Sequence, residues 1–186
     1  WVLEQIIHRA RDLITTQSLA ADATMTAWLT HDIDSLSLEE YLSQDDYVLH
    51  YHLQSWQTHK DPILADLCQQ VGNRLLPKAT EISQYTYLQQ TDILSVARRH
   101  AYPLVSAPEI YVTLRHISNR GYTLYQRGIK LKTPEGLVAI SQLSPLVQTL
   151  TQPCHRTWLL HPAHLAVDKI LAAFSPVAMS TTAPDA

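Results

Sequence analysis

The sequence predicts an α+β fold, in which a helical first part precedes a small, mostly antiparallel sheet with helices packed against it. Two observations predict this fold. Apolar residues recur at helical spacing from residue 1 to about residue 76. After Pro77, short segments alternate between apolar and polar residues and are separated by turns that contain Gly or Pro, which is typical of strands. We therefore expect a helical part over residues 1–77, an α+β part over residues 78–174 and a loosely ordered tail over residues 175–186.

The first predicted helix begins at the first residue. Its apolar stripe consists of Leu3, Ile6, Ile7, Ala10 and Ile14. No Ser, Thr, Asp or Asn precedes Trp1 to cap this helix, and the sequence lacks an initiator Met. We therefore expect the chain to be a piece of a longer protein, cut inside or just before a helix.

Three later helices of the first part have recognisable start signals. Residues 37–40 read Ser-Leu-Glu-Glu and fit a capping box. Asp45 opens the next helix, where a carboxylate suits the helix dipole. Asp61 and Pro62 supply an N-cap and a favoured first helical residue. We expect this last helix to continue until Pro77 stops it.

The second part contains predicted strands and helices in turn. We expect a short strand over 78–83, a helix over 91–100, a link through Pro103 and Pro108, a strand over 111–114, a hairpin over 129–140 with its turn at 133–136, a short helix over 141–150, a strand over 157–160 and a last helix over 164–174. Gly121 and Gly128 bracket a Tyr-rich excursion between the second strand and the hairpin.

The composition excludes several classes of protein. The 186 residues are 46% hydrophobic and carry a formal charge of -3, so a histone-like or basic-tail protein is excluded. No apolar run approaches the roughly 18 residues of a membrane helix, and we expect no membrane partner. Cys68 and Cys154 lie far apart without metal-ligand spacing, which favours a reducing compartment, so we expect a cytoplasmic protein.

Few residues have the pattern of a catalytic or metal site. An adjacent His and Asp, as at His31 and Asp32, can hold a metal ion when other ligands converge on it. Their neighbours read as a polar loop before a capping box, and we interpret the pair as part of that loop. The sequence shows no Gly-rich phosphate loop and no nucleophile elbow. We assign no catalytic, cofactor-binding or metal-binding residue to this chain.

Two basic features are candidate anion sites. Arg74 and Lys78 flank the end of a predicted helix, close enough to meet the same polyanion. Spacing alone favours the structural alternative, in which the cations interact with the helix C-terminus. The second feature is a strip over residues 110–134 without acidic residues, which could contact phosphates or the acidic face of a partner. A solvated sheet face is the alternative that we weigh against it. Its basic residues are Arg115, Arg120, Arg127, Lys130 and Lys132.

Several segments, in order, resemble the C-terminal half of the bacterial HD-superfamily phosphohydrolases, which are relatives of the dNTP triphosphohydrolases. Residues 2–10 resemble the helix that follows their HD domain. Residues 73–78, Asn-Arg-Leu-Leu-Pro-Lys, resemble the family's Asn-Arg-x-Leu-Phe-Lys segment, with Pro77 in place of the usual aromatic. Residues 129–136 and 143–147 resemble the closing hairpin and helix. The resemblance extends over roughly residues 1–161.

The resemblance implies that catalysis and regulation belong to different parts of the parent protein. The catalytic metal, one of Mn, Mg, Fe, Ni or Zn, would belong to an HD domain that lies before Trp1 and is a partner of this chain. Arg74 and Lys78 correspond to residues that contact the triphosphate of a regulatory nucleotide between subunits. The implied function is the regulatory and assembly part of a dNTP phosphohydrolase, working as a homo-oligomer, dimer or tetramer, with this chain alone inactive.

Two alternatives remain open. The first is a non-catalytic module that binds a protein or, more weakly, nucleic acid through the strip over residues 110–134. The second is a free-standing metallohydrolase that uses His31 and Asp32.

Overall fold

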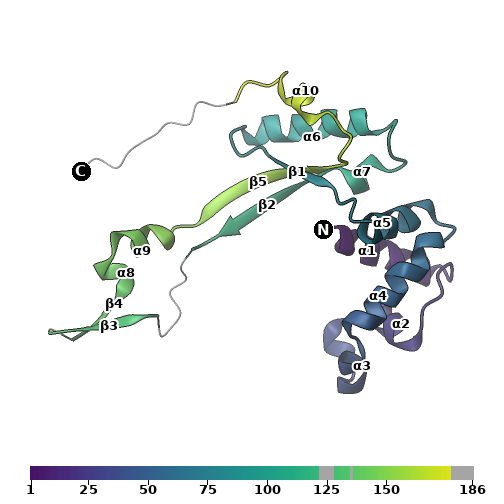
Figure 1. The fold of residues 1–186 in the computed structure, drawn as a ribbon, viewed down its shortest axis with the longest axis horizontal. Helices are drawn as coiled ribbons and strands as arrows, with labels where there is room; N and C mark the ends of the chain where they lie inside the picture. The colour runs from purple at the N-terminus through teal and green to yellow at the C-terminus, as the bar shows by residue number, and fades with distance from the viewer. Residues whose placement is uncertain (122–127, 135, 177–186) are drawn as a thin grey trace. The chain divides into compact units, whose positions relative to one another are not determined.

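A computed structural model describes residues 1–121, 128–134 and 136–176 of the chain (Figure 1). It confirms the predicted α+β fold, because helices fill the first part and small antiparallel strand pairs follow. The described residues form two compact units. The first comprises residues 1–78, 98–112 and 161–165, and the second comprises the described residues within 79–97, 113–160 and 166–176. The contiguous parts expected from the sequence are therefore interleaved in the structure.

Helices build the first unit. They are α1 (Val2–Thr15), α2 (Ala23–Thr30), α3 (Leu38–Ser43), α4 (Asp46–Ser55), α5 (Pro62–Gly72) and α7 (Pro108–Tyr111), with short 3-10 helices η1 (Ile33–Ser35) and η2 (Trp56–Thr58). The three predicted start signals are confirmed. The side chains of Ser37, Asp45 and Asp61 accept hydrogen bonds from the backbone N–H groups of Glu40, Val48 and Leu64, respectively. Each cap satisfies one of the N–H groups that a helix start leaves without a partner.

The core of the first unit lies where α1 packs on α5. Ile6 and Ala10 of α1 and Leu64 and Leu67 of α5 are fully buried. Burying one such aliphatic side chain of Leu or Ile size contributes about 1.5–3 kcal/mol. Tyr111 joins the same core from a distant part of the sequence, which explains why residues 98–112 belong to this unit.

The larger sheet has three strands in the order β1-β5-β2. They are β1 (Lys78–Glu81), β5 (Cys154–His161) and β2 (Thr113–Asn119). Strands β2 and β5 run antiparallel side by side, from Thr113 opposite Leu160 to Asn119 opposite Cys154 (Figure 1). After β1, the N–H of Ile82 donates to the carbonyl of Thr157 at 2.9 Å. In sequence, helix α6 (Tyr87–Ala101) follows β1, and helix α10 (Val167–Leu171) follows β5.

The predicted hairpin is confirmed as a separate two-stranded sheet of β3 (Lys130–Thr133) and β4 (Gly136–Ala139). Gly136 has a φ of +135°, a conformation that side chains rarely adopt. The Thr133 hydroxyl donates to the Gly136 carbonyl at 3.0 Å and closes the turn. Two short helices follow, α8 (Ile140–Leu143) and α9 (Pro145–Leu150).

Several predicted boundaries are wrong, for local reasons. The strand expected from residue 111 begins at Thr113, because Pro108 starts α7 and the Val112 N–H donates to the Pro108 carbonyl at 2.8 Å. The helix expected over 141–150 breaks at Ser144, because Pro145 starts a new helix that Ser144 caps. The helix expected over 164–174 is shortened to α10. The Tyr-rich excursion and the tail beyond residue 176 lie outside the described residues.

In the described ranges, no helix is long and apolar enough to cross a membrane.

Candidate functional site

The helix that carries the candidate anion site ends earlier than predicted. Helix α5 ends at Gly72 with Asn73 as its C-cap, five residues before Pro77, where the apolar stripe had predicted the helix to stop. The N–H of Arg74 donates to the Val71 carbonyl at 3.2 Å, and the N–H of Leu75 donates to the Gln70 carbonyl at 2.9 Å. These two bonds form a left-handed C-cap, in which the residue after the C-cap turns the chain out of the helix.

Arg74 is the left-handed residue of this cap, with a φ of +57°. Glycine is the usual residue at such a position, because a Cβ there approaches the following carbonyl oxygen at a cost of roughly 1–2 kcal/mol. The same motif ends α1, where Gln17 has a φ of +53°. The left-handed backbone at Arg74 therefore sets the position of its side chain, although the Cβ of that side chain makes this conformation unfavourable.

The segment from Arg74 to Lys78 is exposed to solvent except at Pro77, which is half-buried. In the described part of the chain, neither cation makes a side-chain hydrogen bond or an ion pair, and neither donates to the last carbonyls of α5. Between them, Leu75 and Leu76 expose 70% and 52% of their surface. The segment thus combines two cations that have no ion-pair partner among the described residues with two solvent-exposed leucines.

This arrangement is suited to a polyanion. A guanidinium presents paired N–H donors that match phosphate oxygens, and an ammonium adds a mobile point charge. Lys78 is the first residue of β1, so both cations are attached to regular elements on either side of a short connection. Exposed leucines between the cations favour a ligand or a second protein surface that covers them.

The structure distributes the basic strip over different elements. Arg115 lies on β2, in the three-stranded sheet, and is half-buried. Lys130 and Lys132 lie on β3 of the separate hairpin and are exposed, as is Arg120 after β2. Arg127 lies outside the described residues. The strip therefore does not form one face of one sheet.

His31 and Asp32 lie in the loop that the sequence predicts. His31 is the C-cap of α2, and Asp32 precedes η1. Both residues are exposed. Across residues 1–121, 128–134 and 136–176, no three His, Cys, Asp or Glu side chains are grouped to hold a metal ion.

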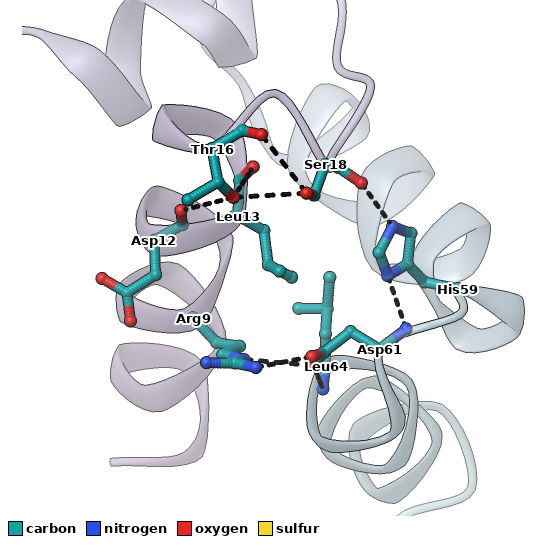
Figure 2. A network of polar contacts seen from close by, with 8 residues as sticks. All are labelled: Arg9, Asp12, Leu13, Thr16, Ser18, His59, Asp61 and Leu64. Carbon is teal, nitrogen blue, oxygen red and sulfur yellow. Dashed lines mark hydrogen bonds and ion pairs between the residues drawn. The ribbon is translucent and has the colours of Figure 1, made fainter.

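A polar network joins the start of α5 to α1, and sequence reasoning identified only its cap (Figure 2). Arg9 donates two hydrogen bonds to Asp61, one from Nε at 3.1 Å and one from Nη2 at 2.5 Å. The hydrogen bond from Arg9 lowers the pKa of the Asp61 carboxyl. The His59 ring lies within 3.1 Å of the Ser18 carbonyl through Nε2, and its Nδ1 accepts from the Asp61 N–H at 3.0 Å. With Nδ1 accepting from Asp61, Nε2 is the ring nitrogen that faces the Ser18 carbonyl.

A second polar contact lies between α2 and α4. His52 is 2% exposed, and its Nε2 lies 3.1 Å from Oδ2 of Asp22, although the ring makes no well-directed hydrogen bond among the described residues. The other carboxylate oxygen of Asp22 caps α2 by accepting from the Met25 N–H at 2.8 Å. That backbone bond, followed by the contact with His52, lowers the pKa of Asp22. The contact links the start of α2 to α4.

A small cleft of about 260 Å³ in the first unit contains a further carboxylate, Asp66. Its Oδ2 accepts from the Tyr111 hydroxyl at 2.6 Å and from the Gln70 amide at 2.8 Å. Burial, followed by the hydrogen bond to Asp66, raises the pKa of Tyr111. Asp66 and Tyr111 are 45 residues apart, and no local pattern in the sequence could have paired them.

Cys68 is fully buried in α5, and burial raises the pKa of its thiol to about 12. This thiol is therefore a core residue and no nucleophile at neutral pH. Cys154 is exposed at the start of β5, and both cysteines are free thiols.

Comparison with known proteins found similarity at low identity. No family model matches the chain. The chain is 25% identical over 162 residues to the uncharacterized protein YwfO of Bacillus subtilis, covering 81% of this chain and 36% of that protein.

Solved structures extend the comparison. A phosphohydrolase from Bacteroides thetaiotaomicron superposes with a TM-score of 0.69 and 20% identity, covering 86% of this chain and 43% of that one. A hypothetical protein from Aquifex aeolicus superposes with a TM-score of 0.46 and 16% identity, over 80% of this chain and 37% of that one. The chain spans about two-fifths of the proteins that it matches, and it shares its fold with part of a phosphohydrolase.

Proposed function

We propose that this chain is the C-terminal regulatory and assembly part of a metal-dependent HD-domain phosphohydrolase that acts on deoxynucleoside triphosphates. In this proposal, Arg74 and Lys78 bind the triphosphate of a regulatory nucleotide where the subunits of a dimer or tetramer meet. The resemblance of residues 73–78 to a phosphate-contacting segment supports it, together with the fold shared with part of a phosphohydrolase.

One observation carries the proposal. Arg74 occupies a left-handed position that favours glycine, it is exposed, and its charge has no partner within the described residues. Strained backbone positions are retained where function requires them. The exposed Leu75 and Leu76 beside it fit a site that a second subunit completes.

In the parent enzyme, catalysis and regulation would belong to different parts of the protein. A divalent metal, held by an HD domain before Trp1, would supply Lewis-acid chemistry and an activated water to the parent enzyme. Residues of this chain would bind the regulatory nucleotide. Because a ligand shifts an equilibrium only by binding one state better, the nucleotide would favour the assembly in which Arg74 and Lys78 meet a second surface.

Nucleotide binding is the first test. Isothermal titration of the 186-residue chain with dGTP should show binding, and Arg74→Ala and Lys78→Ala should each weaken it about tenfold or more, as expected for a lost charge-assisted contact to phosphate. Lys60→Ala is the matched control, because Lys60 is an exposed cation just before the other end of α5. Binding that is absent for every dNTP, or equal in Arg74→Ala and wild type, would contradict the nucleotide site.

Activity is the second test. Hydrolysis of a mixed dNTP pool with Mn²⁺ or Mg²⁺ should be compared for this chain and for a longer protein that includes the sequence encoded upstream of Trp1. We expect an active longer protein and an inactive chain. Activity in the chain itself would make His31 and Asp32 candidate metal ligands again. Inactivity of both the chain and the longer protein would favour a binding module.

A further inference from the structure

Charges of opposite sign are concentrated in two segments of this sequence. Residues 12–59 contain eight Asp and Glu residues and no Lys or Arg. Residues 110–167 contain six Lys and Arg residues and a single acid, Glu135. The formal charge of -3 for the whole chain conceals this separation.

The acidic segment, defined as residues 32–47, comprises η1, α3 and the start of α4. Its exposed carboxylates have no Lys or Arg partner within the part of the chain that the structure describes. They include Asp32, Asp34, Glu39 and Asp46. Large apolar side chains are exposed among them, and Tyr47 reaches 85% exposure. The others are Ile33, Leu38, Tyr41 and Leu42. Exposed apolar side chains interspersed with charged ones are typical of a protein interface.

The basic hairpin, defined as residues 130–139, has the complementary character. Lys130 and Lys132 alternate with Leu131 along β3, and Lys132 lies opposite Leu137 of β4. The pleat therefore places Lys130, Lys132 and Leu137 on one face. Leu137 is 69% exposed, and neither lysine has an ion-pair partner in the described ranges. Two-stranded hairpins are marginally stable in water, so burial of a face would stabilise this one.

We propose that the acidic segment of one copy of this chain binds the basic hairpin of a second copy. The acidic segment carries unpaired carboxylates, and the hairpin face of Lys130, Lys132 and Leu137 carries unpaired positive charge. Both surfaces also expose apolar side chains, so contact between the two gains both ion pairing and apolar burial. Contact between two acidic segments, or between two hairpins, would instead place like charges together. This inference rests on the assembly part of the proposed function and is independent of the nucleotide site.

The test is the oligomeric state of the 186-residue chain, measured by sedimentation velocity at about 0.05 M and about 0.5 M salt, which change the screening length severalfold. We expect a mass above 21.1 kDa at low salt that falls at high salt. The variants K130E/K132E and E39K/D46K should each weaken association about tenfold or more. The variant that combines all four changes should associate again, because the reversed charges are complementary.

Charge reversals elsewhere provide the control. Asp92→Lys on α6 and Lys169→Glu on α10 change exposed residues outside both surfaces and should leave the mass unchanged. Restored association in the four-fold variant also shows that the substitutions of K130E/K132E and E39K/D46K do not prevent folding.

Three results would overturn the inference. Association that ignores both reversals would place the interface elsewhere while leaving the assembly proposal intact. A chain that stays monomeric with and without dGTP would contradict both this interface and the proposed assembly role. A monomer that binds an oligonucleotide through Lys130 and Lys132 would show that the hairpin recognises nucleic acid instead.

Discussion

Arg74 combines a disfavoured backbone conformation with a proposed role, and the two can be measured separately. Arg74→Gly removes the Cβ at a φ of +57°, so we expect it to stabilise the chain by about 1 kcal/mol. Thermal unfolding should report this as a Tm higher by about 2–4 °C. The same variant should lose dGTP binding, because it also removes the guanidinium.

Two variants separate these effects. Arg74→Ala removes the guanidinium but keeps a Cβ in the left-handed conformation, so it should lose binding without the gain in stability. Gln17→Gly relieves the equivalent position of α1 and should raise the Tm while leaving binding unchanged. Equal stability of Arg74→Gly and Arg74→Ala would refute the assignment of strain to this position.

The ion pair between Arg9 and Asp61 makes stability depend on pH. Its hydrogen bonds lower the pKa of Asp61 in the folded protein below the unfolded value of about 3.9. The resulting stability is therefore present above the unfolded pKa and is lost as the pH falls through the folded pKa. Arg9→Met should cost about 2 kcal/mol at pH 7, measured by urea unfolding, and this cost should shrink below about pH 4.

Arg11 offers the matched control for Arg9. It lies on the same helix and is exposed, and its guanidinium donates to the Trp28 carbonyl at 3.4 Å. Arg11→Met should therefore change stability by less than about 0.5 kcal/mol at any pH. A cost of Arg9→Met that is independent of pH would mean that Asp61 contributes as a helix cap alone.

Helix α7 is held on α5 by the hydrogen bond from Tyr111 to Asp66, at 2.6 Å. Tyr111→Phe leaves the carboxylate with one donor fewer in a partly buried cleft, so we expect a loss of about 1–2 kcal/mol in the free energy of unfolding. Tyr85→Phe is the control, because Tyr85 is buried and no described residue makes a hydrogen bond with its hydroxyl. Equal costs for the two variants would show that the Tyr111 hydroxyl contributes nothing specific.

Elements with local signals could be predicted from the sequence. The caps at Ser37, Asp45 and Asp61 and the turn before Gly136 depend on residues within a few positions of one another, and all were found. The end of α5 was not, because its apolar stripe runs on to Leu75, which the structure leaves exposed. The pair Gly72 and Asn73 was the available signal for that boundary.

The candidate site was predictable only as a pair of residues. The positions of Arg74 and Lys78 in the sequence fix their place between α5 and β1, but the left-handed backbone at Arg74 follows from cap hydrogen bonds that spacing does not reveal. Contacts across long separations, such as Tyr111 with Asp66 and Arg9 with Asp61, have no local pattern. For the same reason, the interleaving of the two units could not be foreseen.

The interleaved chain predicts that the helical part does not fold fully when cut at the boundary that the sequence suggests. A fragment of residues 1–77 lacks Tyr111, Val105 and Ile110, which pack against the core formed by α1 and α5. Removing one large aromatic from a core alone costs about 3–5 kcal/mol, so the fragment should lose near-UV circular dichroism and cooperative unfolding. Joining residues 98–112 through a Gly-Ser linker should restore part of both signals. A fragment that unfolds as cooperatively as the whole chain would show that residues 98–112 merely rest on a self-sufficient core.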